Sequence, residues 1–437
     1  MADSTVADDP RVHIDQSPMS RAQIAAVAIL GTLAALDGYD VLAVTFASPG
    51  ITAAWGIDRA ALGVVLSMGL LGMALGSFFL SPLADRFGRK PLVLATLALM
   101  AGGMAASAFA TNVTELSFWR VITGLGIGGM ISVVVAMTAE YANARHRPLA
   151  VAVVALGYPI GGVIGGSIAA SLLYYFDWRA VFWLGAVAAL IMAPIVMLWA
   201  PESISYLLTR KSEKALAHLN RVLARCRKPL LASMPIGAVQ VDRPRSSIFS
   251  RDEILPTLHV TAMNFLFVVT VYYMLSWMPQ MTADAGYGPT EAASVSVIAS
   301  LSGVVGGTIL GLLVPLVGVK PAGLVAFLGL AAATVAFGFT PPTLDLLQIA
   351  GGVVGFFLFP GMVAIYTIIA RSFPAETRAT GTGFVVGMGR GSSALAPLIA
   401  GFMFASGLGR DGVSMAMAVC ALAAAVVLVF LRVRQNA

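Results

Sequence analysis

Charged residues are scarce in this chain. Asp, Glu, Lys and Arg make up 11% of its 437 residues, whereas an average soluble domain has about 25%. That difference excludes an ordinary soluble globular protein. The two cysteines, Cys226 and Cys420, are too few for a disulfide framework. The net charge of +6 is spread over the loops and gives no indication of a nucleic-acid partner.

Motifs of soluble enzymes are absent from the sequence. It contains no phosphate-binding G-x-x-x-x-G-K-[ST] loop, so ATP is not expected to drive the protein's activity. The four histidines share no spacing typical of a metal site; they are His13, His146, His218 and His259. We therefore expect no enzymatic activity, no cofactor and no metal.

Apolar sequence, in contrast, is abundant. Hydrophobic residues make up 58% of the chain and gather in twelve long segments. About 20 apolar residues are enough to cross the hydrocarbon core of a bilayer. The pattern predicts an all-α membrane protein with twelve transmembrane helices in two six-helix halves. The expected helices span residues 22–47, 58–80, 91–111, 115–138, 147–173, 179–200, 255–281, 288–316, 321–339, 344–369, 377–407 and 411–432.

A long polar connection divides the chain into two sets of six segments. It contains "LLTRKSEKALAHLNRVLARCRKP", whose basic character and helical spacing of apolar residues predict an amphipathic helix on the membrane surface. The acidic start of the chain lacks the order of a signal peptide and is predicted to be a disordered cytoplasmic tail. The expected domains are an N-terminal tail (1–21), a first bundle (22–200), a linker (201–254), a second bundle (255–432) and a C-terminal tail (433–437).

The basic residues predict how the chain lies in the membrane. With both termini on one side, that side carries 22 Lys and Arg, and the other carries Arg59, Arg179 and Arg410. Cytoplasmic loops are enriched in Lys and Arg, so both termini are expected in the cytoplasm. This indicates a multi-pass plasma-membrane protein, which in a bacterium is an inner-membrane protein.

Two aspartates stand inside the first apolar segment, in "LDGYD". Charges in hydrocarbon cost about 2.5–3.5 kcal/mol each on insertion scales and usually serve a function. Arg120 is expected at the depth of Asp40 and could pair with it, which leaves Asp37 without a partner. A dry, unpaired carboxylate holds a proton more tightly, so Asp37 is the candidate proton carrier. The alternative is that both aspartates only cap or bridge helices.

Arg390 is the fourth charge inside the predicted helices. Its planar guanidinium can grip a carboxylate with two hydrogen bonds. The second half of the chain has acids only near the ends of its predicted helices and none in the membrane interior. Unless Asp37 reaches across, we expect a substrate carboxylate to bind Arg390; the alternative is a permanent ion pair. Aromatic side chains could hold an aromatic ring of the substrate, although each of them alone is more typical of core or lipid contacts. The candidates are Tyr158, Trp277, Tyr273, Phe356 and Phe384, with Tyr272, Phe359 and Tyr366 as further ones.

Three motifs resemble those of the major facilitator superfamily. "GSFFLSPLADRFGRKP" is similar to its loop signature through Asp85, Arg86, Gly88, Arg89 and Lys90. "RVITGLGIGGM" and "APESISYLL" resemble two further patterns of the superfamily, although the second has lost the family's proline and arginine. The resemblance covers the whole chain and implies a major facilitator fold, transport by alternating access and a monomer.

Further motifs resemble the aromatic acid:proton symporters of that superfamily. "LDGYD" looks like their D-G-[FY]-D motif, "RATGTGFVVGMGRGSS" is similar to their R-a-T-G…G-x-G-R-x-G pattern, and "YYMLSWMP" is typical of them. The resemblance implies uptake of an aromatic carboxylate, such as a hydroxybenzoate, together with protons. The second-half counterpart of the loop signature is degraded to "LLVPLVGVKP".

A cytoplasmic latch is also expected. Asp85, Arg89 and Glu140 are predicted at the cytoplasmic surface, where the positive dipole end of the eleventh helix could receive Asp85. Arg378 is the expected equivalent in the second half.

Two other functions compete with uptake. One is a proton-coupled exporter of drugs or metabolites, because "GYPIGGVIGG" resembles an antiporter element, with Tyr158 replacing a glycine. The other is a receptor or sensor, for which no signalling domain is visible.

Overall fold

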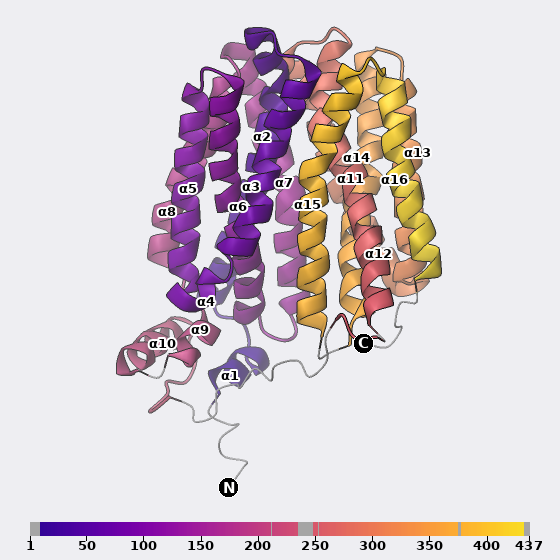
Figure 1. The fold of residues 1–437 in the computed structure, drawn as a ribbon. Helices are drawn as coiled ribbons and strands as arrows, with labels where there is room; N and C mark the ends of the chain where they lie inside the picture. The colour runs from indigo at the N-terminus through magenta and orange to yellow at the C-terminus, as the bar shows by residue number, and fades with distance from the viewer. Residues whose placement is uncertain (1–8, 211, 235–247, 252, 375–376, 432–437) are drawn as a thin grey trace.

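The computed structural model describes residues 9–210, 212–234, 248–251, 253–374 and 377–431. Within these residues, twelve helices of 21 residues or more form one bundle (Figure 1). They are α2 (Arg21–Trp55), α3 (Arg59–Phe79), α5 (Arg89–Phe109), α6 (Val113–Tyr141), α7 (Arg147–Tyr175), α8 (Arg179–Trp199), α11 (Ile254–Asp284), α12 (Pro289–Val317), α13 (Val319–Phe339), α14 (Leu344–Ser372), α15 (Arg378–Ala405) and α16 (Arg410–Phe430).

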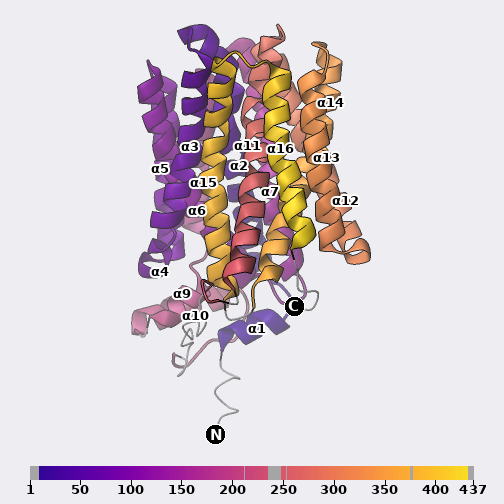
Figure 2. The same ribbon diagram turned by 45° about the vertical axis from the view of Figure 1, so that its right-hand side comes forward.

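The predicted all-α fold is confirmed. Among the helices whose residues are all described, eleven are long and apolar enough to cross a membrane. The twelfth, α15, is 28 residues long and lies between α3 and α11 in the bundle (Figures 1 and 2). Most helix ends agree with the predicted ones within a few residues. The largest difference is in α2, which continues through Pro49 to Trp55 and ends at Gly56, where φ is 61°.

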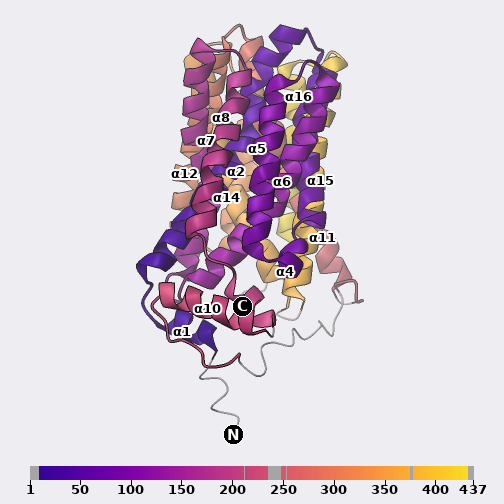
Figure 3. The ribbon, with the colours of Figure 1, turned by 90° about the vertical axis from the view of Figure 1, so that its left-hand side faces the viewer.

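Short helices gather at one end of the bundle. They are α1 (Pro10–Gln16), α4 (Leu83–Phe87), α9 (Ile204–Thr209) and α10 (Glu213–Arg225). Figure 3 shows α1, α4 and α10 below the long helices. We call this the α10 end and the other the far end.

The expected amphipathic helix exists as α10, and protein covers its apolar side. Its apolar residues Leu219 and Leu223 are 0% exposed, and α9 is among the elements that it contacts. The apolar side of α10 is therefore covered by protein. An amphipathic pattern predicts one apolar side of a helix but does not specify what buries it.

The prediction of a disordered N-terminal tail is wrong for the part that is described. Helix α1 docks against the α6–α7 connection, where Asp15 forms an ion pair with Arg147. A second anchor follows α1, because the Nζ of Lys228 donates a hydrogen bond to the carbonyl oxygen of Pro18 at 2.9 Å. These polar contacts join the start of the chain to residues far away in sequence.

Glycines let helices within the first half approach backbone to backbone. A Cβ added at Gly128 in α6 would lie 2.0 Å from the carbonyl oxygen of Met73 in α3. One added at Gly38 in α2 would lie 2.2 Å from the carbonyl oxygen of Tyr158 in α7. Small residues at such crossings are what membrane helices use for close packing.

The crossing at Gly128 generates a prediction about stability. Gly128→Ala should destabilise the protein by about 1–3 kcal/mol, the usual cost of overpacking, because the contact is with backbone that cannot move aside. The measurement is the melting temperature of the purified protein in detergent. Gly102→Ala is the matched control, since an added Cβ there meets no atom within 4 Å. Equal melting temperatures for the two variants would contradict this account.

Candidate functional site

Asp37 is buried near the middle of α2 without a hydrogen-bond partner. Its side chain is 1% exposed, and neither carboxylate oxygen forms a hydrogen bond within the described residues. Asp40 and Arg390 lie within electrostatic reach of it. Because Arg390 belongs to the second half, this electrostatic interaction crosses between the two halves.

The residues that follow Asp37 point to different neighbours. Gly38 packs on the backbone of Tyr158 in α7. The Tyr39 hydroxyl donates a hydrogen bond to the carbonyl oxygen of Val181 in α8 at 2.6 Å. Successive helical residues are about 100° apart, so the "LDGYD" motif fixes α2 against two helices while Asp37 faces the second half.

Asp40 and Arg120 lie together in the core of the first half. Arg120 donates from Nη2 to the backbone carbonyl oxygen of Asp40 at 2.9 Å and from Nη1 to the sulfur of Met104 at 3.2 Å. Its guanidinium carbon lies 5.7 Å from the ring centre of Phe182. Arg120 and Asp40 are neighbours as predicted, but Arg120 bonds the main-chain carbonyl of Asp40 and not its carboxylate. The Asp40 carboxylate makes no hydrogen bond with the described residues.

Arg390 extends from α15 to the first half of the protein. Its Nη1 donates a hydrogen bond to the hydroxyl of Ser77 in α3. One turn earlier, a Cβ added at Gly387 would meet no atom within 4 Å, so space is open beside this part of α15. The guanidinium therefore has a neutral partner, an acid within electrostatic reach and free space nearby.

Three tyrosines from both halves surround these charges. The Tyr158 hydroxyl is shielded from water and has the hydroxyl of Tyr272 as its polar neighbour; Tyr366 and Asp37 lie within electrostatic reach of it. Tyr366 is 45% exposed, yet it lies within electrostatic reach of Arg390. It therefore faces a water-accessible space inside the bundle.

Other aromatic candidates are engaged in packing within the second half. Trp277 donates from Nε1 to the carbonyl oxygen of Pro397 at 3.2 Å, and its ring centre is 4.7 Å from that of Phe404. The Tyr273 hydroxyl is hydrogen-bonded to that of Ser414 at 2.8 Å. Both side chains thus serve contacts of α11 with α15 and α16.

Phe384 and Phe356 also lie apart from the charges. Phe384 packs edge-to-face on Phe249, with ring centres 5.3 Å apart. Phe356 lines a groove between α12 and α14 with Asp345 and other residues. The phenylalanine that reaches Tyr158 is Phe359, at 6.4 Å between ring centres.

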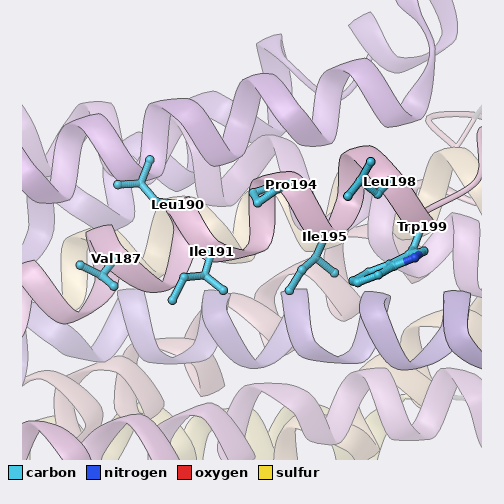
Figure 4. A pocket seen from close by; sticks show the side chains of 7 residues that line it. All are labelled: Val187, Leu190, Ile191, Pro194, Ile195, Leu198 and Trp199. Carbon is cyan, nitrogen blue, oxygen red and sulfur yellow. The ribbon is translucent and has the colours of Figure 1, made fainter.

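A second groove is an outer surface feature. It has a volume of about 520 Å³ and runs along α8 (Figure 4), where it is lined by Val187, Leu190, Ile191, Pro194, Ile195, Leu198 and Trp199. All seven are apolar, as expected for a lipid-facing surface, and they offer nothing that binds a charged ligand.

Comparison with known proteins places the chain in a family. The model of the major facilitator superfamily matches residues 28–347 and 260–437. The chain belongs to the major facilitator superfamily. The protein is therefore a membrane transporter and not an enzyme.

Several characterised transporters are similar to this one. A 4-hydroxybenzoate transporter of Pseudomonas putida is 30% identical over 87% of this chain and 86% of its own. A 3-(3-hydroxy-phenyl)propionate transporter of Escherichia coli is 30% identical over 88% of both chains. A gallate transporter of Pseudomonas putida is 27% identical over 92% of this chain and 90% of its own.

Solved structures support the fold. The inward-open xylose transporter of E. coli superposes with a TM-score of 0.73 and 20% identity, covering 94% of this transporter and 97% of that chain. A D-xylose-proton symporter gives a TM-score of 0.73 with 18% identity, over 93% of this chain and 96% of its own.

The predicted latch residues of this transporter do not all meet. Arg89 forms an ion pair with Glu140, and the hydroxyl of Ser203 donates to the same glutamate at 2.7 Å. Asp85 is exposed and has neither a hydrogen bond nor an ion pair among the described residues. The Nε of Arg378 is buried and forms no hydrogen bond within them.

A polar network closes the far end between the halves. Arg59 and Asp284 form an ion pair at 2.6 Å, and Gln280 donates to Asp284 at 2.9 Å. The Thr52 hydroxyl in turn donates to the side-chain oxygen of Gln280 at 3.3 Å. This network was not predictable from the sequence, because Arg59 is one of three outer basic residues and Asp284 follows an apolar segment as an ordinary loop acid does.

The placement of Arg120 generates a prediction about coupling. Asp40→Asn and Arg120→Gln should each lower the rate of transport. The loss in the double variant should be smaller than the sum of the two single losses, because either change disturbs the same buried interaction. The measurement is the free-energy coupling from initial uptake rates, with cell-surface expression determined for every variant. Losses that add without interaction would exclude an energetic link between these residues.

Proposed function

We propose that this transporter takes up a small aromatic carboxylate, similar to a hydroxybenzoate, together with protons by alternating access. The observation that carries the proposal is that Asp37 and Arg390, which come from opposite halves, lie within electrostatic reach of each other, with open space beside α15 at Gly387. The printed names of the relatives, which include transporters of 4-hydroxybenzoate and gallate, support an aromatic acid as the substrate.

Arg390 is the proposed anchor for the carboxylate. In the structure its guanidinium donates to a neutral hydroxyl, that of Ser77. A carboxylate would offer charge-assisted bonds to the planar fork, which are roughly twice as strong as neutral ones. The ring would then lie against Tyr158 and Phe359. The packing contacts of Trp277, Tyr273, Phe356 and Phe384 leave these four as weaker candidates for ring contacts.

The same arrangement suggests how a proton is coupled to the substrate. An opposite charge nearby favours the ionised form of a carboxyl group. When a substrate carboxylate neutralises Arg390, Asp37 loses the positive charge that acts on it from the second half. Asp37 then takes up a proton more readily. Asp40 and Arg120 would hold α2 in place during this exchange.

Alternating access requires that each end of the bundle can close. We place the α10 end and both termini of this plasma-membrane protein in the cytoplasm, which makes the Arg59–Asp284 network at the far end the outer closure of an inward-facing state. The domain boundaries predicted from sequence are part of this proposal, as is a monomer. When the α10 end closes, Asp85 would meet the start of α15 near Arg378, supported by Arg89 and Glu140. Export of drugs or metabolites is the alternative direction of transport.

Removing the carboxylate of Asp37 should uncouple transport from protons. Asp37→Asn is expected to abolish accumulation driven by a pH gradient while exchange of internal for external substrate survives, since exchange needs no net proton movement. The measurement is uptake of labelled 4-hydroxybenzoate into vesicles with and without the gradient. Asp345→Asn, at an exposed position, is the matched control. Gradient-driven accumulation by Asp37→Asn would remove Asp37 from the proton path, and accumulation in the opposite direction by the unmodified protein would favour the exporter.

Changing Arg390 should remove selectivity for acids. The unmodified protein should bind benzoate-type acids and ignore the matching amides, because an amide leaves the guanidinium without a counter-charge. Arg390→Lys loses the planar fork and should weaken binding. Arg390→Gln should weaken it by at least about tenfold, as expected for losing hydrogen bonds of about 1.5–3 kcal/mol each. Competition by acid and amide pairs against labelled substrate measures this.

Arg371→Gln, which removes a charge at the end of α14, is the control for Arg390. It should keep the preference for acids. If Arg390→Gln keeps that preference as well, the carboxylate is held elsewhere, and Arg120 or Arg378 becomes the next residue to test.

A further inference from the structure

The hydroxyl of Tyr158 stands apart from the other buried tyrosine hydroxyls. Tyr39 donates to the carbonyl oxygen of Val181, Tyr141 donates to that of Glu202, and the Tyr273 hydroxyl is bonded to that of Ser414. Among the described tyrosines, Tyr158 alone has a hydroxyl oxygen that is shielded from water and makes no hydrogen bond to the main chain or to a residue other than a tyrosine; its polar neighbour is the hydroxyl of Tyr272. A phenol can both donate and accept, so the two hydroxyls have hydrogen-bonding capacity left for a ligand.

The surroundings of this hydroxyl point to a ligand. Tyr272 in α11 and Tyr366 in α14 lie close to it from the second half, and Arg390 lies within electrostatic reach of both. The ring of Phe359 faces that of Tyr158 at a tilt of 54°. Phenol groups and one phenyl ring therefore converge beside the guanidinium, next to the water-accessible space that Tyr366 faces.

We infer that Tyr158, with Tyr272 and Tyr366, forms a subsite that selects substrates carrying a hydroxyl group on the aromatic ring. This inference rests on the proposed function. A carboxylate held at Arg390 directs the other end of the ring toward the tyrosines. A phenol can both donate and accept a hydrogen bond, as can a tyrosine hydroxyl, so a ring hydroxyl can bind between the hydroxyls of Tyr158 and Tyr272.

The energetic consequence is a preference that an apolar pocket would not produce. A site that hydrogen-bonds a substrate hydroxyl rejects the analogue without it, because the buried polar groups of the site stay unpaired. One neutral hydrogen bond contributes about 0.5–1.5 kcal/mol, which corresponds to an affinity ratio of up to about tenfold. The transporter should therefore bind 4-hydroxybenzoate or 3-hydroxybenzoate up to about tenfold more tightly than benzoate.

The test is competition against labelled 4-hydroxybenzoate in vesicles. The competitors are 4-hydroxybenzoate, 3-hydroxybenzoate, benzoate and 4-hydroxybenzamide, for the unmodified protein, Tyr158→Phe and Tyr287→Phe. Tyr287 is the matched control, because its hydroxyl donates to the carbonyl oxygen of Pro342 at an exposed position. Tyr158→Phe should bring the ratio of hydroxybenzoate to benzoate affinity close to one while acids remain preferred over the amide. Tyr287→Phe should change neither preference.

Each other result overturns a specific statement. If the hydroxyl preference persists in Tyr158→Phe, or if the unmodified protein has none, the subsite is wrong while the role of Arg390 stands. If Tyr158→Phe weakens benzoate and hydroxybenzoates equally, its hydroxyl acts only on the structure. If the unmodified protein binds no aromatic acid, the proposed function itself fails. Should Tyr158→Phe not fold, as judged by its melting temperature, the variants Tyr272→Phe and Tyr366→Phe provide the same comparison.

Discussion

The carboxylate of Asp37 and the guanidinium of Arg390 come from opposite halves of the chain and act on each other inside a membrane. Neither charge is tolerable in hydrocarbon without a partner or a function. The surrounding helices hold the two charged side chains beside open space. Gly38 brings α2 onto α7, and Ser77 in α3 receives Arg390. The charges thus set the position of the site, and the close helix packing keeps it there.

The fold was predictable because crossing a membrane demands long apolar helices, and these are visible as runs in the sequence. Details that depend on contacts between residues far apart in sequence were not predictable. Pro49 does not end α2, since prolines are tolerated inside membrane helices when neighbours compensate. The apolar side of α10 is buried by protein, and α1 is held by Arg147. The helical pattern of α10 was visible in the sequence and α1 was predicted to be disordered, and in both cases the covering surface lies far away in sequence.

The candidate site was predictable in its charges and only partly in its aromatic residues. Asp37 and Arg390 were conspicuous because charge is rare in apolar segments. Phe356 and Phe359 are three residues apart on α14, and nothing local distinguishes the one in the groove from the one that faces Tyr158. Trp277 and Tyr273 have the right chemistry but are used by α15 and α16. Such choices are made by tertiary packing.

The ion pair between Arg59 and Asp284 has a consequence for thermodynamic balance. Both side chains are about one-third exposed, and exposed ion pairs contribute only about 0–1 kcal/mol. Breaking this ion pair therefore costs little free energy. The pair favours contact between the two halves but does not lock them together. The closed and open arrangements of the far end therefore lie close together in free energy as far as this contact is concerned, and the far end acts as a reversible closure rather than a fixed seal.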